Sequence, residues 1–289
     1  MNFLKQTFFS IGLFLVFLIP TQSAEAATRD QLLAQIQSLL EQISHLQALV
    51  NEMNKEGVEP IPIPANLYQT AYYDGPLESV YEVSRGKLRK YNGQEPRRVD
   101  EEYFEFITEL YGDDIIEKYI GEFRVFSNSQ LDLGAFVEKK LGGKWIIGIN
   151  RYDLDLDYKS DREYFADLLI HELAHILIYY ESDSLENFTN KFWTYKDSVH
   201  SKKLESLSGD EQFYEMYDYY KGNKSRFFSD YATYNVDEDY SESFVAYVLN
   251  KASRYDGEKY NKQVFFNDYD SLRQIRLEIR SNLRDLDLF

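Results

Sequence analysis

Two of the four histidines in the chain lie four residues apart, in the segment ADLLIHELAHILIYY (166–180). On an α-helix, residues at this spacing lie about 40° apart around the axis and about 6 Å apart along it. The imidazoles of His171 and His175 can therefore reach one metal ion, and Glu172 lies beside that ion. This H-E-x-x-H spacing predicts two zinc ligands and a general base that takes a proton from water. A buried helix that carries these polar residues by chance is the alternative.

A catalytic zinc ion usually has three protein ligands, so a third must lie elsewhere in the sequence. A continuous helix would carry Glu181 about 80° off the histidine face and about 9 Å beyond His175, out of reach. His200 lies in a polar stretch without a supporting pattern. Glu238 and Glu242 are better candidates, because they lie four apart on a predicted helix whose other face is apolar. One carboxylate could bind the metal while the other orients a histidine; two solvated carboxylates are the alternative.

These motifs resemble those of the lethal-factor-like (ATLF-type) gluzincin zinc metallopeptidases, a group that includes the Pro-Pro endopeptidases. The chain shares H-E-x-x-H at 171–175, then Tyr231, then Glu238 seven residues later within EDYSESF. The resemblance covers about residues 67–285 in layout, but only these two short motifs are specific. The long spacer between His175 and Glu238 predicts an inserted helical element.

The resemblance implies three ligands for one catalytic Zn²⁺: His171, His175 and Glu238. It also implies that Glu172 is the general base and that Tyr231 donates a hydrogen bond to the oxyanion of the substrate. Glu242 would lie behind the ligands and hold a histidine. The implied fold is α+β and zincin-like, with a mixed sheet and an active-site helix followed by a helical lobe.

Local patterns predict the elements that would position these residues. The segments GAFVEKKL and KWIIGIN flank Gly142 and Gly143 and predict a β-hairpin. Ser160 and Glu163 form a capping-box pattern, so we expect the active-site helix to begin there and to end near Tyr180. The strand 144–150 is expected to be the sheet edge on which a substrate adds as a further strand. Its substrate-binding residues would then be Trp145, Ile147 and Ile149; an ordinary sheet strand is the alternative.

The first 26 residues have the pattern of a secretory signal peptide. A lysine near the start precedes an apolar run, Phe8–Ile19, and the segment ends in Ala24-Glu25-Ala26. The apolar run is shorter than the roughly 20 residues that span a bilayer. We therefore expect a cleaved signal 1–26 and a secreted, extracytoplasmic protein without stable membrane insertion; a retained anchor is the alternative.

Residues 27–53 are predicted to form a coiled-coil helix, because apolar side chains recur at alternate spacings of four and three. These side chains are Leu32, Ile36, Leu39, Ile43, Leu46, Val50 and Met53. The pattern favours a homo-oligomer through residues 28–53, with an intramolecular helix as the alternative. Three prolines within 54–66 predict an extended linker, and a zinc metallopeptidase domain would occupy 67–289.

The composition limits the classes of partner. Asp and Glu outnumber Lys and Arg by 49 to 32, and the net charge is −17, which argues against nucleic-acid binding. The chain has no cysteine, so no disulfide can stabilise it. We therefore expect a secreted endopeptidase that hydrolyses peptide or protein substrates with a water activated by zinc and Glu172. The alternative is a secreted coiled-coil interaction protein with a structural or catalytically inactive zinc site, which a fourth protein ligand would favour.

Overall fold

A computed structural model describes residues 77–91, 93, 95–129, 133–140, 143–152 and 154–288. The predicted signal peptide, coiled-coil helix and linker lie outside these residues. In the described part of the chain, no helix has both the length and the apolar character needed to cross a membrane.

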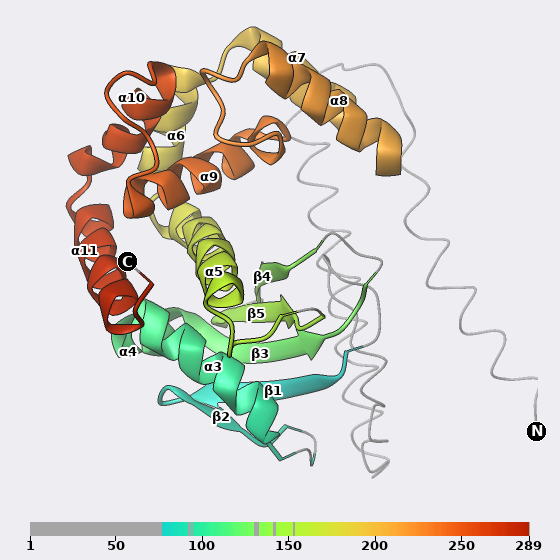
Figure 1. Ribbon diagram of the computed structural model, residues 1–289, viewed down its shortest axis with the longest axis vertical. Coiled ribbons are helices and arrows are strands. Elements are labelled where there is room, and N and C mark those ends of the chain that lie inside the picture. Colours follow the sequence, from blue (N-terminus) through green and yellow to red (C-terminus); the bar gives the residue numbers. More distant parts are fainter. Residues whose placement is uncertain are drawn as a thin grey trace, which may run out of the picture. The chain divides into compact units, whose positions relative to one another are not determined.

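A five-stranded sheet forms one part of the fold (Figure 1). Its strands are β1 (Ser79–Ser84), β2 (Lys87–Arg89), β3 (Ile120–Phe126), β4 (Ala135–Lys139) and β5 (Trp145–Asn150). The strand order is β2-β1-β3-β5-β4; β3 and β5 are parallel and the other neighbours are antiparallel. The predicted pairing of the two hairpin arms is confirmed, since β4 and β5 pair antiparallel.

Helices precede the hairpin and fill the chain after it. They are α3 (Arg98–Tyr111), α4 (Asp113–Tyr119), α5 (Lys159–Tyr180), α6 (Ser182–Phe192), α7 (Tyr195–Leu204), α8 (Gly209–Gly222), η2 (Tyr231–Thr233), α9 (Val236–Leu249), α10 (Glu258–Phe265), η3 (Phe266–Asp268) and α11 (Asp270–Asp285). The α+β class is therefore confirmed, and helices do occupy the long spacer before Glu238.

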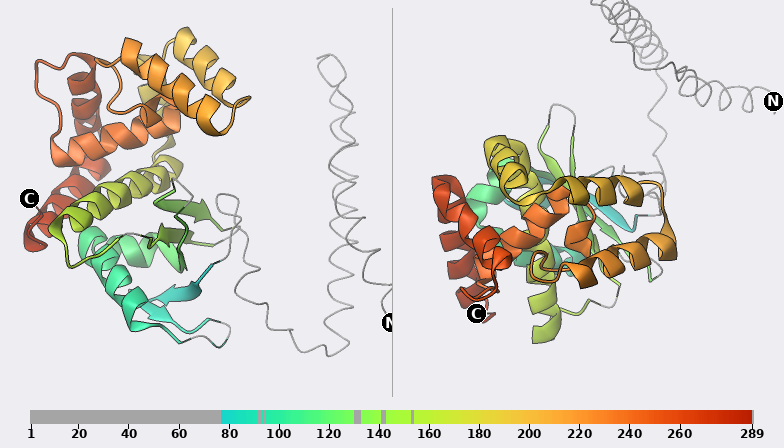
Figure 2. Two further views of the ribbon diagram at one scale, coloured as in Figure 1. Left: turned by 45° about the vertical axis from the view of Figure 1, so that its right-hand side comes forward. Right: turned by 90° about the horizontal axis from the view of Figure 1, so that it is seen from above.

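The sheet is apolar on both faces. Phe123, Val137 and Ile147 point toward the helices and join the main core, where Phe104 of α3 packs on Phe123 with ring centroids 5.3 Å apart. Alternate residues form a smaller cluster on the other face: Leu77, Val80, Phe126, Phe136 and Ile146. Figures 1 and 2 show α5 between the sheet and α9, and α5 packs against both β4 and α9. This sandwiched position buries most of α5 and fixes the direction in which its polar residues point.

The prediction that strand 144–150 forms the sheet edge is wrong. This strand, β5, is hydrogen-bonded to β3 on one side and to β4 on the other, so no further strand can add to it. Ile147 and Ile149 are fully buried in the core and cannot contact a substrate, and Trp145 is also buried. The edge strand on this side is β4. The apolar run of β5 on both faces is typical of such an interior strand.

The predicted start of the active-site helix also needs correction. The helix α5 begins at Lys159, with Tyr158 as its N-cap and no capping side chain. Ser160 lies inside the first turn, where its hydroxyl donates to Asp161 at 3.1 Å, so the capping box with Glu163 does not form.

A fully buried ion pair holds α9 against α10. The ammonium of Lys262 lies 2.6 and 2.9 Å from the two carboxylate oxygens of Asp239, and the indole of Trp193 donates to the same carboxylate at 2.8 Å. The Phe227 ring lies 4.3 Å from the ammonium. Because Asp239 follows Glu238 directly, this pair anchors the turn of α9 that carries the candidate ligand.

Replacing Lys262 by Met should therefore lower the free energy of unfolding by about 3–5 kcal/mol, because the Asp239 carboxylate would stay buried without its cation. Urea denaturation measures this loss. The double variant Lys262→Met/Asp239→Asn should recover part of it. As a matched control, Lys221→Met breaks the exposed pair with Asp218 and should leave the free energy of unfolding almost unchanged. Equal losses in the buried and the exposed variants would contradict the anchoring role.

His200 on α7 is a second buried polar group, and its side chain packs against α8. Its ring stacks on Tyr219 with centroids 3.8 Å apart, and its Nε2 has no hydrogen-bond partner among the described residues. Burial lowers the pKa of His200 below 6.5, although the Glu215 carboxylate, 3.6 Å from Nδ1, acts in the opposite direction. Lys203 lowers this pKa further, and Asp197 raises it.

The unfolded chain therefore takes up a proton at His200 more readily than the folded chain does. Folding stability should fall as the pH drops below 6.5, toward the lower pKa of the folded state. Urea denaturation of the metal-free protein on both sides of this pH, compared with His200→Phe, tests this expectation. The phenylalanine keeps the stacking on Tyr219 and cannot titrate, so the variant should lose less stability on acidification. Identical pH dependence in the two proteins would contradict it.

Candidate metal centre

Three side chains from α5 and α9 converge on one point. The Nε2 atom of His171 lies 3.0 Å from Oε2 of Glu238, and Nε2 of His175 lies 3.3 Å from the same oxygen. The two Nε2 atoms are 3.1 Å apart. The three atoms thus form a nearly equilateral triangle, and they are the one group in the described part of the chain whose spacing could hold a metal ion.

This triangle has the size that a metal ion requires. Ligand bonds of 2.0–2.2 Å in a tetrahedron place neighbouring ligand atoms about 3.4 Å apart. Carboxylate oxygens and unprotonated imidazole nitrogens carry lone pairs that repel one another at such distances, so the group needs a positive charge at its centre. Two imidazoles and one carboxylate form a donor set that suits zinc.

Residues behind the ligands fix the orientation of the imidazoles. Nδ1 of His171 lies 3.0 Å from Oε1 of Glu242, which favours a proton on Nδ1 and leaves the lone pair of Nε2 for a metal. Ser241 lies behind His175, with its hydroxyl 3.4 Å from Nδ1. The role of Glu242 was predicted, whereas that of Ser241 was not. The signal for Ser241 is its position three residues after Glu238, on the same face of α9.

The start of α9 holds Glu238 in place. The side chain of Asn235 is the N-cap, and its oxygen accepts the backbone N–H of Glu238 at 2.9 Å. Asp237, Glu238 and Asp239 all lie in the first turn, where the helix dipole stabilises negative charge. The ligand carboxylate therefore lies on a capped, regular turn.

In the metal-free centre, protons supply the positive charge. Burial by itself lowers the pKa of His171, but its hydrogen bonds with Glu238 and Glu242 outweigh this effect and raise the pKa to about 10. Burial raises the pKa of Glu238, but its hydrogen bonds with His171 and His175 lower it to about 2. Metal binding must displace such protons from the histidines, so metal affinity should rise with pH.

Glu172 lies beside the triangle but is not part of it. The backbone of Val137 on β4 lies close to its carboxylate and acts to lower its pKa. Burial raises the pKa of Glu172, while the charges of His175 and His171 act in the opposite direction. A carboxylate whose pKa is raised toward neutrality is suited to accept a proton and to return it.

Tyr231 approaches the centre from η2. Its ring centroid lies 5.9 Å from that of His171, and its hydroxyl lies near the Glu238 carboxylate. The ring is 46% exposed, yet burial around the hydroxyl and the nearby charges of Glu238 and Glu172 raise its pKa well above 10. The hydroxyl therefore stays protonated and can act as a hydrogen-bond donor.

The structure brings together six of the residues singled out from the sequence: His171, Glu172, His175, Tyr231, Glu238 and Glu242. Glu181 and His200 lie outside the group, as expected. Glu181 is the C-cap of α5, and His200 faces Glu215.

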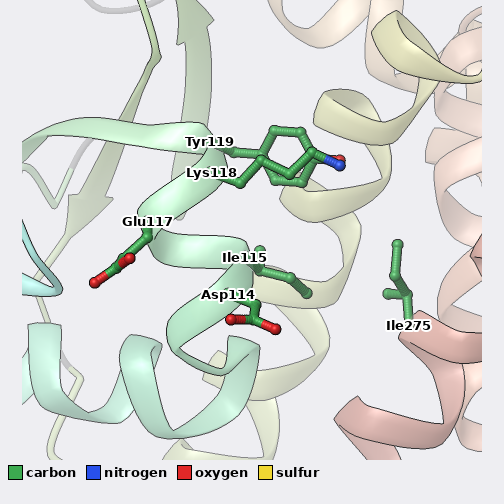
Figure 3. A pocket seen from close by; sticks show the side chains of 6 residues that line it. All are labelled: Asp114, Ile115, Glu117, Lys118, Tyr119 and Ile275. Carbon is green, nitrogen blue, oxygen red and sulfur yellow. The ribbon is translucent and has the colours of Figure 1, made fainter.

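A separate surface depression lies between α4 and α11 (Figure 3). Its lining residues are Asp114, Ile115, Glu117, Lys118, Tyr119 and Ile275. None of them belongs to the candidate metal centre, so this depression is not the place where the chemistry of that centre would occur.

Removing the carboxylate behind His171 should weaken metal binding. We expect Glu242→Gln to lower Zn²⁺ affinity about 10- to 100-fold, because the imidazole loses its anionic hydrogen-bond partner. Competition with a chromophoric chelator measures the affinity. The control Glu163→Gln changes an exposed carboxylate on α5, the helix that carries His171, and should bind Zn²⁺ like the unmodified protein. An unchanged affinity in Glu242→Gln would exclude the proposed orienting role.

Comparison with known proteins adds no relative to this description. No family model, no curated protein and no solved structure matches the chain. The chemistry of the centre must therefore be argued from its own geometry.

Proposed function

We propose that this protein is a secreted zinc-dependent endopeptidase with a zincin-like fold that hydrolyses peptide bonds in peptide or protein substrates. The observation that carries the proposal is the triangle of His171, His175 and Glu238, with Glu172 on one side and the Tyr231 hydroxyl nearby. Among the described residues, the group offers three ligand atoms and no fourth from a histidine, cysteine, aspartate or glutamate. Three protein ligands leave one position for water, as in catalytic zinc sites.

Zinc bound by these three residues would lower the pKa of a water molecule to about 7 and polarise a substrate carbonyl. Glu172 takes the proton from the attacking water and later gives it to the leaving amine. Its position beside the ligands but outside the ligand triangle leaves its carboxylate available for both steps. The Tyr231 hydroxyl donates a hydrogen bond to the carbonyl oxygen as negative charge develops there, which stabilises the transition state more than the substrate.

The edge strand β4 provides the surface for an extended substrate. The backbone groups of Gly134 and Lys140 form hydrogen bonds with the β5 arm. Because backbone groups alternate in direction along a strand, the N–H and C=O groups of Ala135, Val137 and Lys139 point to the open side of β4. The backbone of Val137, in the middle of this strand, lies close to the Glu172 carboxylate. A peptide added along β4 would therefore pass directly beside the general base.

Two variants separate the roles of the residues around the metal. Glu172→Gln keeps the size of the side chain but cannot accept the proton, so kcat should fall by about 10²- to 10⁴-fold while bound zinc is retained. Tyr231→Phe removes the donor to the oxyanion and should lower kcat by about 10²- to 10³-fold, also without loss of zinc.

Mass spectrometry of an unbiased peptide library, digested by the zinc-loaded protein, measures both effects, and elemental analysis gives the zinc content. Cleavage that persists in Glu172→Gln would refute the mechanism. Loss of zinc from Tyr231→Phe would instead assign that tyrosine a structural role. A fourth protein ligand, detected by X-ray absorption spectroscopy, would favour a structural zinc site in an interaction protein.

A further inference from the structure

The helix face of α5 that carries Glu172 and His175 extends toward both ends of the helix, beyond the metal centre. Tyr164, Leu168, Glu172, His175 and Tyr179 follow one another at spacings of four, four, three and four, so they lie in one line along the helix. We call this line the α5 stripe. Glu172 in its middle is buried and Leu168 and His175 are half-buried, whereas Tyr164 and Tyr179 at its ends are 60% and 58% exposed.

The edge strand β4 runs beside the α5 stripe in the same direction. At one end, a Cβ atom added to Gly134 would lie only 2.8 Å from Leu168. In the middle, the backbone of Val137 lies close to the Glu172 carboxylate. At the other end, the ammonium of Lys139 lies 5.3 Å from the ring centroid of Tyr179. A peptide paired with β4 would therefore follow the stripe from the centre toward Tyr179.

Aromatic rings gather at that end of the stripe. Tyr179 meets the edge of Trp145 at 5.7 Å and lies 5.0 Å from Tyr180. The Lys139 ammonium lies 5.3–5.7 Å from all three of these rings and donates to the Tyr180 hydroxyl at 3.3 Å. Trp145 is buried and supports Tyr179 from behind, so the Tyr179 ring is held in place while much of its surface stays open.

We propose that Tyr179 forms a specificity subsite for an aromatic side chain of the substrate. This side chain belongs to the residue that pairs with Lys139, two positions from the residue that pairs with Val137 beside Glu172. Directly opposed residues of paired strands project their side chains to the same face, about 5 Å apart. The substrate side chain therefore emerges where the Lys139 side chain does, against the Tyr179 ring. The inference rests on the proposed endopeptidase function.

The chemistry of the subsite favours an aromatic group over a carboxylate. The Lys139 ammonium already has cation–π interactions with three aromatic rings. It also donates hydrogen bonds to the Tyr180 hydroxyl and to the backbone oxygen of Gly143. An acidic side chain would have to break these contacts in a protein of net charge −17. An aromatic ring can stack on Tyr179 without displacing them.

Two readouts on one position-scanning peptide library test this subsite. Cleavage by the zinc-loaded protein gives the ratio of kcat/KM for peptides with an aromatic residue to that for peptides with alanine at the same position. Binding to immobilised Glu172→Gln protein, which does not cleave, gives the same ratio for the amounts of peptide retained. At one position, aromatic residues should be preferred about tenfold in both readouts. Tyr179→Ala should reduce both ratios toward one, and Tyr179→Phe should keep them.

The control Tyr195→Ala changes a tyrosine of α7 that is 84% exposed, and it should keep both ratios. An aromatic preference that survives in Tyr179→Ala, or an acidic preference that Lys139→Met removes, would overturn the subsite. Retention with the aromatic preference but no cleavage would overturn the endopeptidase proposal alone. A library that is neither cleaved nor retained would overturn both.

Discussion

The contact between the His171 imidazole and the Glu238 carboxylate, 3.0 Å long, joins the two central helices of this protein at the point where its chemistry is concentrated. With His175, these groups place three lone pairs within about the ligand spacing of a single metal ion. Such a group is unfavourable without a positive charge, so protons or a metal must be present for α5 and α9 to pack as they do. Folding and cation binding are thus coupled at this site.

Partners on neighbouring helices offset the desolvation of the buried carboxylates of α9. Its first turn carries three acids, and two of them, Glu238 and Asp239, have partners on other helices. Glu238 faces the two histidines, while Asp239 points to the opposite side and pairs with the fully buried Lys262. Glu242, one turn later, meets His171 from behind. Because these partners come from α5 and α10, the position of each carboxylate is set by helices on both sides of α9.

The sheet contributes an edge rather than a ligand. The parallel pairing of β3 with β5 places β4 on the outside, and the open side of β4 meets α5 at Val137 and Glu172. This arrangement gives the proposed enzyme a backbone surface for its substrate beside its general base. It also leads to Tyr179, where the rings of Trp145 and Tyr180 and the Lys139 ammonium surround the end of the stripe.

Local spacing was sufficient to predict much of the site. The intervals 171–175 and 238–242 each equal about one helical turn, so the shared faces of the histidines and of the glutamates follow from helix geometry alone. The resemblance to a known family then linked the two segments and added Tyr231. Helix ends were harder to predict, since α5 begins at Lys159 without the capping box that the sequence suggested.

Other features depended on contacts between distant parts of the chain. The order of strands is one of them, since the pairing of β3 with β5 joins segments that the β4 strand separates in the sequence. For this reason Trp145, Ile147 and Ile149 were assigned to a substrate that they cannot reach. Ser241 and Tyr179 gained their roles only when α9 and β4 were placed against α5. The sequence alone determined which residues share a helix face, and the tertiary structure decided which faces meet, because periodicity is local whereas packing joins residues far apart in the chain.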